Sequence, residues 1–347
     1  MVEEKTFELG HSDFVMDMCL DHYGRRLATC SQDGIIKIFR RTNSVQGWEE
    51  VYKTPAASSG INKLSWSHPE FSMLLACCTD RSIIVWEEEE ENEWKQLFYN
   101  AEFSDPICGL EFGPKHLGLR LAVSTGDGKV RIYSPTDALR KEWMVRHTFN
   151  VSSGDTSESS VTGGGGGAGG MDVADYSTLT SCLSWNTFSF DAPSMVVGSG
   201  KTAFFWKMDR EKKRWRQIGQ LPPQSHNAVV NHVAWAPNMG RSFHMIATAS
   251  SDGTAKIWKL ETTKPTSSND KSSSLPNESD SLLGDGNVEV SLMHVLDHPN
   301  ACEVFRVEWN LTATMLSTSC DDGIVRLWSP NLRGEWTTQL NLDDRAD

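Results

Sequence analysis

Hydrophobic and polar residues alternate along most of the chain in short runs, a period of two that is typical of β-strands with one buried face. In "IATASSDGTAKIW" at 246–258, two such runs are joined by an Asp-Gly turn, which favours a tight hairpin. The same frame of small residues, turn acid and final aromatic returns in "LATCSQDGIIKIF" at 27–39, "LACCTDRSIIVW" at 75–86, "LAVSTGDGKVRIY" at 121–133 and "LSTSCDDGIVRLW" at 316–328. "MVVGSGKTAFFW" at 195–206 keeps the frame without the acid. The pattern therefore predicts six repeats.

The spacing of the repeats predicts the fold class. The turn positions 33, 80, 127, 200, 252 and 322 are 47, 47, 73, 52 and 70 residues apart, close to the length of a four-stranded propeller blade. The two long intervals contain segments 150–176 and 261–287, which we expect to be flexible low-complexity insertions. The prediction is an all-β, six-bladed β-propeller formed as a single domain by residues 1–347, with blades at roughly 10–53, 58–100, 104–149, 177–220, 227–296 and 300–341.

One predicted strand has no place in the six blades. "KTFEL" at 5–9 precedes the first repeat, and the last repeat has its own outer strand, "EWTTQL" at 335–340. The extra strand either pairs onto blade six or belongs to an open ring that is completed by a seventh blade in trans. Since an unpaired strand invites another chain to pair with it, we expect a partner to bind at this edge, with affinity from the main chain. The predicted partner-binding residues are Thr6, Phe7, Glu8 and Leu9, with Phe7 and Leu9 as side-chain anchors.

Composition narrows the possible functions. A net charge of −13 argues against direct binding of nucleic acid or an anionic membrane. The sequence has no signal-peptide run after Met1 and no apolar stretch long enough to span a bilayer, so we expect a protein that is neither secreted nor membrane-spanning. The eight cysteines lack C-x-x-C spacing, and we expect no metal and no cofactor. Six of them fall in predicted strands and are interpreted as small buried hydrophobic residues: Cys19, Cys30, Cys77, Cys108, Cys182 and Cys302.

Two motifs resemble catalytic or nucleotide sites without meeting their requirements. "GSGKT" at 198–202 lacks the first glycine of a phosphate loop, where Met195 stands, and a strand follows it instead of a helix. His11 and Asp33 are interpreted as part of the buried His–Asp–Ser/Thr–Trp network of such repeats, which is incomplete here because Phe39 replaces the tryptophan. With no combination of acid, base and nucleophile to be found, we predict that the chain is not an enzyme.

The repeats are identified as WD repeats. Three longer stretches are more specific to one family of these proteins: "WSHPEFSMLLACCTDRSIIVWEE" at 66–88, "FGPKHLGLRLAVSTGDGKVRIY" at 112–133 and "WAPNMGRSFHMIATASSDGTAKIW" at 235–258. They resemble the Seh-type nucleoporins, small propellers of the Y-shaped scaffold complex of the nuclear pore. The resemblance covers all six repeats and is weakest in repeat four and in the two insertions. "PKHLGLRLA" and "PNMGRSFH" favour this family over the related Sec-thirteen propeller of the COPII coat.

The resemblance implies a structural scaffold subunit at the nuclear pore complex of the nuclear envelope that supports nucleocytoplasmic transport. Its expected partners are an α-solenoid nucleoporin that donates a blade in trans, other Y-complex nucleoporins and, in some organisms, a vacuolar or lysosomal nutrient-signalling complex. Two alternatives remain. A COPII-type vesicle coat adaptor would use the same edge for a different solenoid, whereas a peptide-reading WD propeller would bind through exposed Arg or aromatic residues near the central channel.

Overall fold

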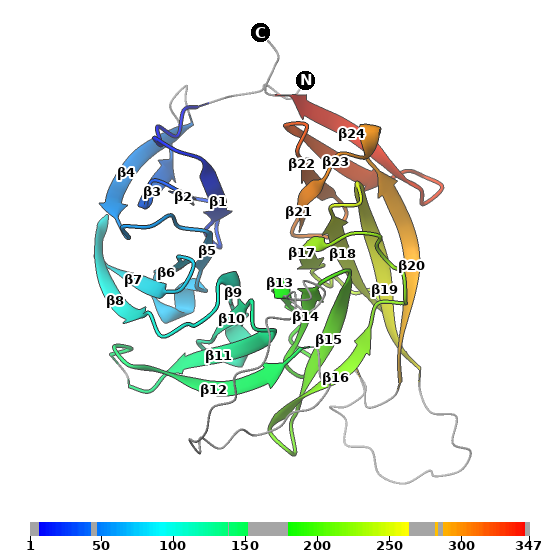
Figure 1. Ribbon diagram of the computed structural model, residues 1–347, viewed down its shortest axis with the longest axis horizontal. Helices are drawn as coiled ribbons and strands as arrows, with labels where there is room; N and C mark the ends of the chain where they lie inside the picture. Colours follow the sequence, from blue (N-terminus) through cyan, green and yellow to red (C-terminus); the bar gives the residue numbers. More distant parts are fainter. Residues whose placement is uncertain are drawn as a thin grey trace, which may run out of the picture. The chain divides into compact units, whose positions relative to one another are not determined.

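The computed structural model is built almost entirely of β-strands, which form six antiparallel four-stranded sheets (Figure 1). In every sheet the strands lie in chain order, so each sheet is one blade and the predicted six-bladed β-propeller is confirmed. Two compact units, Met1–Thr148 and Phe149–Asp347, divide the chain and are described separately. The structure describes residues 7–42, 47–137, 139–151, 180–263, 282–283 and 287–343.

The first unit holds blades one to three. Two short 3-10 helices, η1 (Pro69–Phe71) and η2 (Lys115–Leu117), lie between the first and second strands of blades two and three. The strands are β1 (Val15–Leu20), β2 (Arg26–Ser31), β3 (Ile35–Arg41) and β4 (Trp48–Pro55), then β5 (Lys63–Trp66), β6 (Leu74–Cys78), β7 (Ile83–Glu90) and β8 (Glu93–Asn100), then β9 (Ile107–Phe112), β10 (Leu121–Thr125), β11 (Lys129–Pro135) and β12 (Trp143–Asn150).

The second unit holds blades four to six, with the 3-10 helix η4 (Pro299–Ala301) before the last blade. Its strands are β13 (Thr180–Trp185), β14 (Ser194–Ser199), β15 (Thr202–Asp209) and β16 (Arg214–Gln220), then β17 (Val230–Trp235), β18 (His244–Ser250), β19 (Thr254–Thr263) and β20 (Asn287–Asp297), then β21 (Val304–Trp309), β22 (Leu316–Cys320), β23 (Ile324–Pro330) and β24 (Trp336–Asp343). In the described residues, no helix has the length and apolar character needed to cross a membrane.

Side chains between neighbouring blades form the core of each unit. In the first unit, Ile38 of blade one packs in one cluster with Leu64 and Leu75 of blade two. In the second unit, Trp235 and Trp258 of blade five pack with Phe205 of blade four. Burying a side chain of this size contributes roughly 1.5–3 kcal/mol. The stacking of one blade on the next is therefore the main source of stability within each unit.

One buried carboxylate fixes a segment that the sequence assigned to an insertion. Asp191 accepts hydrogen bonds from His244 Nε2 at 2.7 Å and from the N–H groups of Leu282 and Leu283 at 2.8 and 3.0 Å. The Leu283 side chain is buried in the core of blades four and five. The predicted insertion at 261–287 therefore includes residues that belong to the fold, since β19 continues to Thr263 and Leu282 and Leu283 bond to Asp191. Its remainder, and most of the insertion predicted at 150–176, lie outside the described residues.

Candidate partner-binding site

The two faces of the blade-one sheet have different surroundings. Residues that pair across β1, β2 and β3, such as Cys19, Ala28 and Ile38, lie on the face that packs against blade two. On the same face, the carboxylate of Asp17 accepts the N–H of Leu64 at 2.9 Å. Side chains alternate between faces along a strand, so the neighbouring pairs lie on the opposite face. We call this the outer face of blade one: Leu20, Leu27 and Phe39 in one row, and Met18, Thr29 and Lys37 in the next.

The N-terminal segment crosses part of this outer face. The ring of Phe7 lies 5.5 Å from that of Phe39, edge to face, and 6.2 Å from that of Trp48, stacked. Lys37 Nζ donates to the backbone carbonyls of Leu9 and Gly10, both at 2.8 Å. These contacts draw the segment over the sheet instead of along a sheet edge.

The predicted strand at 5–9 is therefore not found where the structure can test it. Residues 7–9 belong to no strand, and Thr6 lies outside the described residues. Of the other predicted partner-binding residues, Phe7 and Leu9 are half-buried against their own blade and Glu8 is exposed. The period-two pattern at 5–9 predicts a paired strand. In the structure, the Phe7 ring and the bonds from Lys37 to the carbonyls of Leu9 and Gly10 hold this backbone across the sheet instead.

The part of the outer face formed by β1 is bare. Met16, Met18 and Leu20 are 42%, 49% and 54% exposed, and Phe14 and Tyr23 beside them are 79% and 62% exposed. We call these five residues the β1 patch. A group of exposed apolar side chains on one strand and its flanks is typical of a protein-binding surface.

The equivalent positions in blades three and five are buried. Phe112 in blade three and Trp235 in blade five occupy the register position of Leu20, and they are only 7% and 4% exposed. Each is covered by the preceding blade of its own unit, through clusters that include Leu74 and Phe205 respectively. Blade one is the first blade of its unit, so its outer face has no preceding blade there.

Sequence reasoning missed the β1 patch, although its signal is present in "VMDMCL" at 15–20. Cys19 points toward blade two, so that face of β1 is accounted for. Met16, Met18 and Leu20 add a second apolar side of the same strand. A strand with both sides apolar indicates that both sides are covered in the functional state.

The polar groups beside the patch serve the fold. His11 bonds Asp33 through Nδ1 at 3.1 Å and Thr29 through Nε2 at 2.9 Å, as the sequence predicted for a structural network. Burial alone would raise the pKa of Asp33, but the N–H groups of Ser12 and Ile35 and the His11 side chain lower it to about 2. Phe39 cannot supply the N–H with which Trp258 bonds Thr248 in blade five, so the network of blade one is incomplete. The "GSGKT" turn leads directly into strand β15, which excludes the phosphate-loop geometry.

The repeat fold, the turn networks and the bare first-blade face define the class: the chain is a WD-repeat β-propeller. The family described as "WD domain, G-beta repeat" matches residues 3–40, 48–87, 215–259 and 290–329. Over 356 residues the chain is 30% identical to nucleoporin SEH1 of Osmerus mordax, which covers 97% of this chain and 86% of the relative. It is 30% identical over 361 residues to nucleoporin SEH1 of Saccharomyces cerevisiae, covering 96% and 97% of the two chains. With nucleoporin SEH1 of Homo sapiens it shares 28% identity over 356 residues, covering 97% and 87%.

This chain belongs to the nucleoporin SEH1 family. The resemblance predicted from the repeat sequences is therefore confirmed. Both the repeat fold and the nucleoporin relatives indicate a structural protein rather than a catalyst.

Proposed function

We propose that the chain is a structural scaffold subunit of the Y-shaped coat of the nuclear pore, and that it binds an α-solenoid nucleoporin through the outer face of blade one. The family places the chain at the nuclear pore complex of the nuclear envelope. The observation that supports this binding mode is the β1 patch, because Leu20 is 54% exposed at a register position that is buried in blades three and five.

The geometry favours added strands as the bound element. The equivalent faces in blades three and five are covered by a neighbouring four-stranded sheet, so a sheet supplied by the partner would cover Met16, Met18 and Leu20 in the same way. A seventh blade donated in trans has this form. Phe7 and Leu9 then form part of the floor of the site, with Glu8 exposed beside them.

The test is co-purification from nuclear-envelope extract followed by mass spectrometry. The bait is the full chain, compared with a Met18→Asp, Leu20→Asp double variant. A matched control is the Leu311→Asp, Leu332→Asp double variant, which introduces the same two charges at exposed leucines of the second unit. We expect α-solenoid nucleoporins with the parent chain and with the control, and their loss from the double variant while circular dichroism shows an unchanged fold.

Other outcomes distinguish the alternatives. Vesicle-coat solenoids captured through the same patch would favour a COPII-type adaptor. Solenoid nucleoporins retained by the double variant would refute the β1 patch as the binding site. The same extract would show whether the vacuolar or lysosomal signalling complex and the other Y-complex nucleoporins, both implied by the resemblance, accompany the chain.

A further inference from the structure

Blade six differs from blades one and five in the network around its turn acid. In blade five, Asp252 Oδ2 accepts from His226 Nδ1 at 3.0 Å and from the N–H of Asn227 at 2.9 Å. In blade one, Asp33 makes the same two bonds to His11 and Ser12. In blade six the residue that follows the histidine is Pro299, which has no N–H to donate.

The histidine of blade six is left half-satisfied. His298 Nε2 bonds Thr318 Oγ1 at 2.8 Å, as its counterparts do in blades one and five. Its Nδ1, however, is buried and has no hydrogen-bond partner among the described residues. This nitrogen therefore does not bond the turn acid as its counterparts in blades one and five do.

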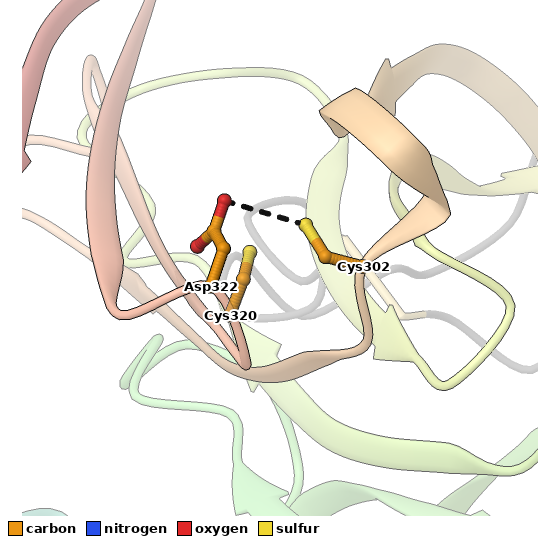
Figure 2. A group of neighbouring side chains, drawn as sticks. All are labelled: Cys302, Cys320 and Asp322. Carbon is orange, nitrogen blue, oxygen red and sulfur yellow. Dashed lines mark hydrogen bonds between the residues drawn. The ribbon is translucent and has the colours of Figure 1, made fainter.

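A cysteine takes the place of the missing donors. The chain runs six positions from His298 to Val304, the start of β21, against four from His226 to Val230 in blade five. The longer loop forms η4 and ends on Cys302, whose thiol donates to Asp322 Oδ2 at 3.5 Å (Figure 2). The N–H of His298 bonds the carbonyl of Gly253 at 3.3 Å, which anchors the start of the loop to blade five.

A second cysteine faces the first. Cys320 pairs with Val304, the register position that Ser31 and Ser250 hold in blades one and five. Each of those serines donates its hydroxyl to the backbone carbonyl two residues before the first strand, the position that Cys302 holds in blade six. The two cysteines therefore occupy positions that already approach each other in this fold.

The three side chains converge in blade six. The two Sγ atoms and a carboxylate oxygen of Asp322 all lie within 4.8 Å of one another, and Figure 2 shows both sulfurs and the carboxylate turned toward one small volume. In zinc sites the metal–sulfur bond is about 2.3 Å, so two bonded sulfurs are at most about 4.6 Å apart. The upper bound of 4.8 Å on the separation in blade six is therefore close to this limit.

We propose that Cys302, Cys320 and Asp322 form a binding site for a thiophilic divalent cation of the Zn²⁺ class. Two thiolates and a carboxylate are the donors that such a cation prefers.

The charges near the site suit a cation with two positive charges. Arg326 holds the carboxylate of Asp322 at both oxygens, Nη2 to Oδ2 at 2.5 Å and Nη1 to Oδ1 at 3.2 Å. Two thiolates, the carboxylate, this guanidinium and a divalent cation together carry no net charge.

Binding exchanges protons for the metal and involves no redox step. Each S–H bond is broken, its proton is released to solvent, and the sulfur lone pair forms a bond to the cation. The hydrogen bond from Cys302 to Asp322 Oδ2 is lost, which frees that oxygen lone pair for the metal. Arg326 keeps its place on the carboxylate and holds it in position.

The test uses the full chain, reduced and freed of metal by a chelator, with Co²⁺ as the spectroscopic probe. We expect one equivalent of Co²⁺ to produce thiolate-to-cobalt charge-transfer absorption, Zn²⁺ to displace it, and two protons to be released per cation. Cys302→Ser and Cys320→Ser should each weaken binding at least about tenfold, in line with the loss of a metal ligand. Cys108→Ser is the matched control, a half-buried cysteine of the first unit that should bind as the parent chain does.

A second readout separates a metal site from a general effect on folding. Zn²⁺ should raise the melting temperature of the parent chain and of Cys108→Ser but not that of Cys302→Ser. The proposal is wrong if the reduced chain shows no thiolate–cobalt absorption, or if Cys302→Ser retains it. It is also wrong if Cys302 and Cys320 form a disulfide during aerobic purification and the chain, once reduced, takes up no cation.

Discussion

Replacing Asp191 by alanine should destabilise the second unit strongly and release the segment that contains Leu283. The carboxylate is fully buried, and it accepts from His244 Nε2, from Asn186 Nδ2 at 2.9 Å and from the N–H groups of Leu282 and Leu283. Alanine leaves His244 Nε2 and the two leucine N–H groups without this acceptor. Each buried donor left unpaired costs about 1–3 kcal/mol.

For three such donors we therefore expect a loss of about 3 kcal/mol or more, a large part of the stability of an ordinary domain. Equilibrium urea unfolding measures the loss, and hydrogen exchange at Leu282 and Leu283 shows whether the segment is released. Asp209→Ala is the matched control, because Asp209 is half-buried at the end of β15 and accepts from the N–H groups of Glu211 and Lys212 in the turn that follows it. A loss below about 1 kcal/mol with unchanged exchange at the two leucines would refute the reasoning, since it would mean that the buried bonds are not needed.

The pH dependence of the same variant is a further check. Burial alone would raise the pKa of Asp191, but the bonds from His244, Leu283 and Asn186 lower it below its usual value. A carboxyl whose pKa is lower in the folded state stabilises the fold above the unfolded pKa of about 3.9 and loses that contribution as the pH falls through the folded value. The difference between the parent chain and Asp191→Ala should thus be complete at neutral pH and shrink in acid. A difference that is constant down to pH 2 would contradict the assigned role of the charge.

Three further predictions follow from other parts of the molecule. The Phe7→Asp, Leu9→Asp variant should weaken solenoid binding in pull-downs while the six sheets persist by circular dichroism; loss of the fold would show that the segment is needed for folding, not only for binding. Burial lowers the pKa of His226, so the free energy of unfolding should fall as the pH drops below about 6.5. His226→Gln should flatten this decline between pH 7 and 5, and the same decline in the variant and the parent chain would contradict the prediction. Gly253→Ala should lower the melting temperature by several degrees, because Gly253 has a φ of 82° and an added Cβ would lie 2.6 Å from Ala301 Cα. The same change at Gly240 tests the backbone strain alone, since φ is 96° there and no atom lies within 4 Å of the added Cβ.

The sequence predicted the blades because the information for them is local. A period of two fixes which residues face the core, and in four of the six repeats a turn acid followed by glycine fixes where the hairpin closes. Gly253 shows the physical basis, with its positive φ and the N–H of Thr254 bonded to Asp252. The same signals placed β24 at the end of the last repeat, as the structure has it.

The sequence was less informative where residues far apart in the chain decide the structure. Residues 7–9 do not form the predicted strand, because Lys37 and Phe39 hold them across the sheet. Cys302, expected inside a strand, lies instead after η4, because the loop from His298 is two residues longer than in blade five. Its proximity to Cys320, 18 positions later, depends on the pairing of Val304 with Cys320 and is invisible to a search for closely spaced cysteines.

At the β1 patch, the repeat pattern predicts buried side chains, but the structure leaves them exposed. In a repeat protein each unit is stabilised by its neighbours, and blades three and five bury Phe112 and Trp235 under the blade before them. Leu20 occupies the same position and has the same apolar character, yet it is more than half exposed. Met16, Met18 and Leu20 are about half exposed, so covering them would contribute roughly 0.7–1.5 kcal/mol for each side chain, half the value for full burial. That free energy is not used in folding the first unit, so it remains available to bind a sheet that packs against β1.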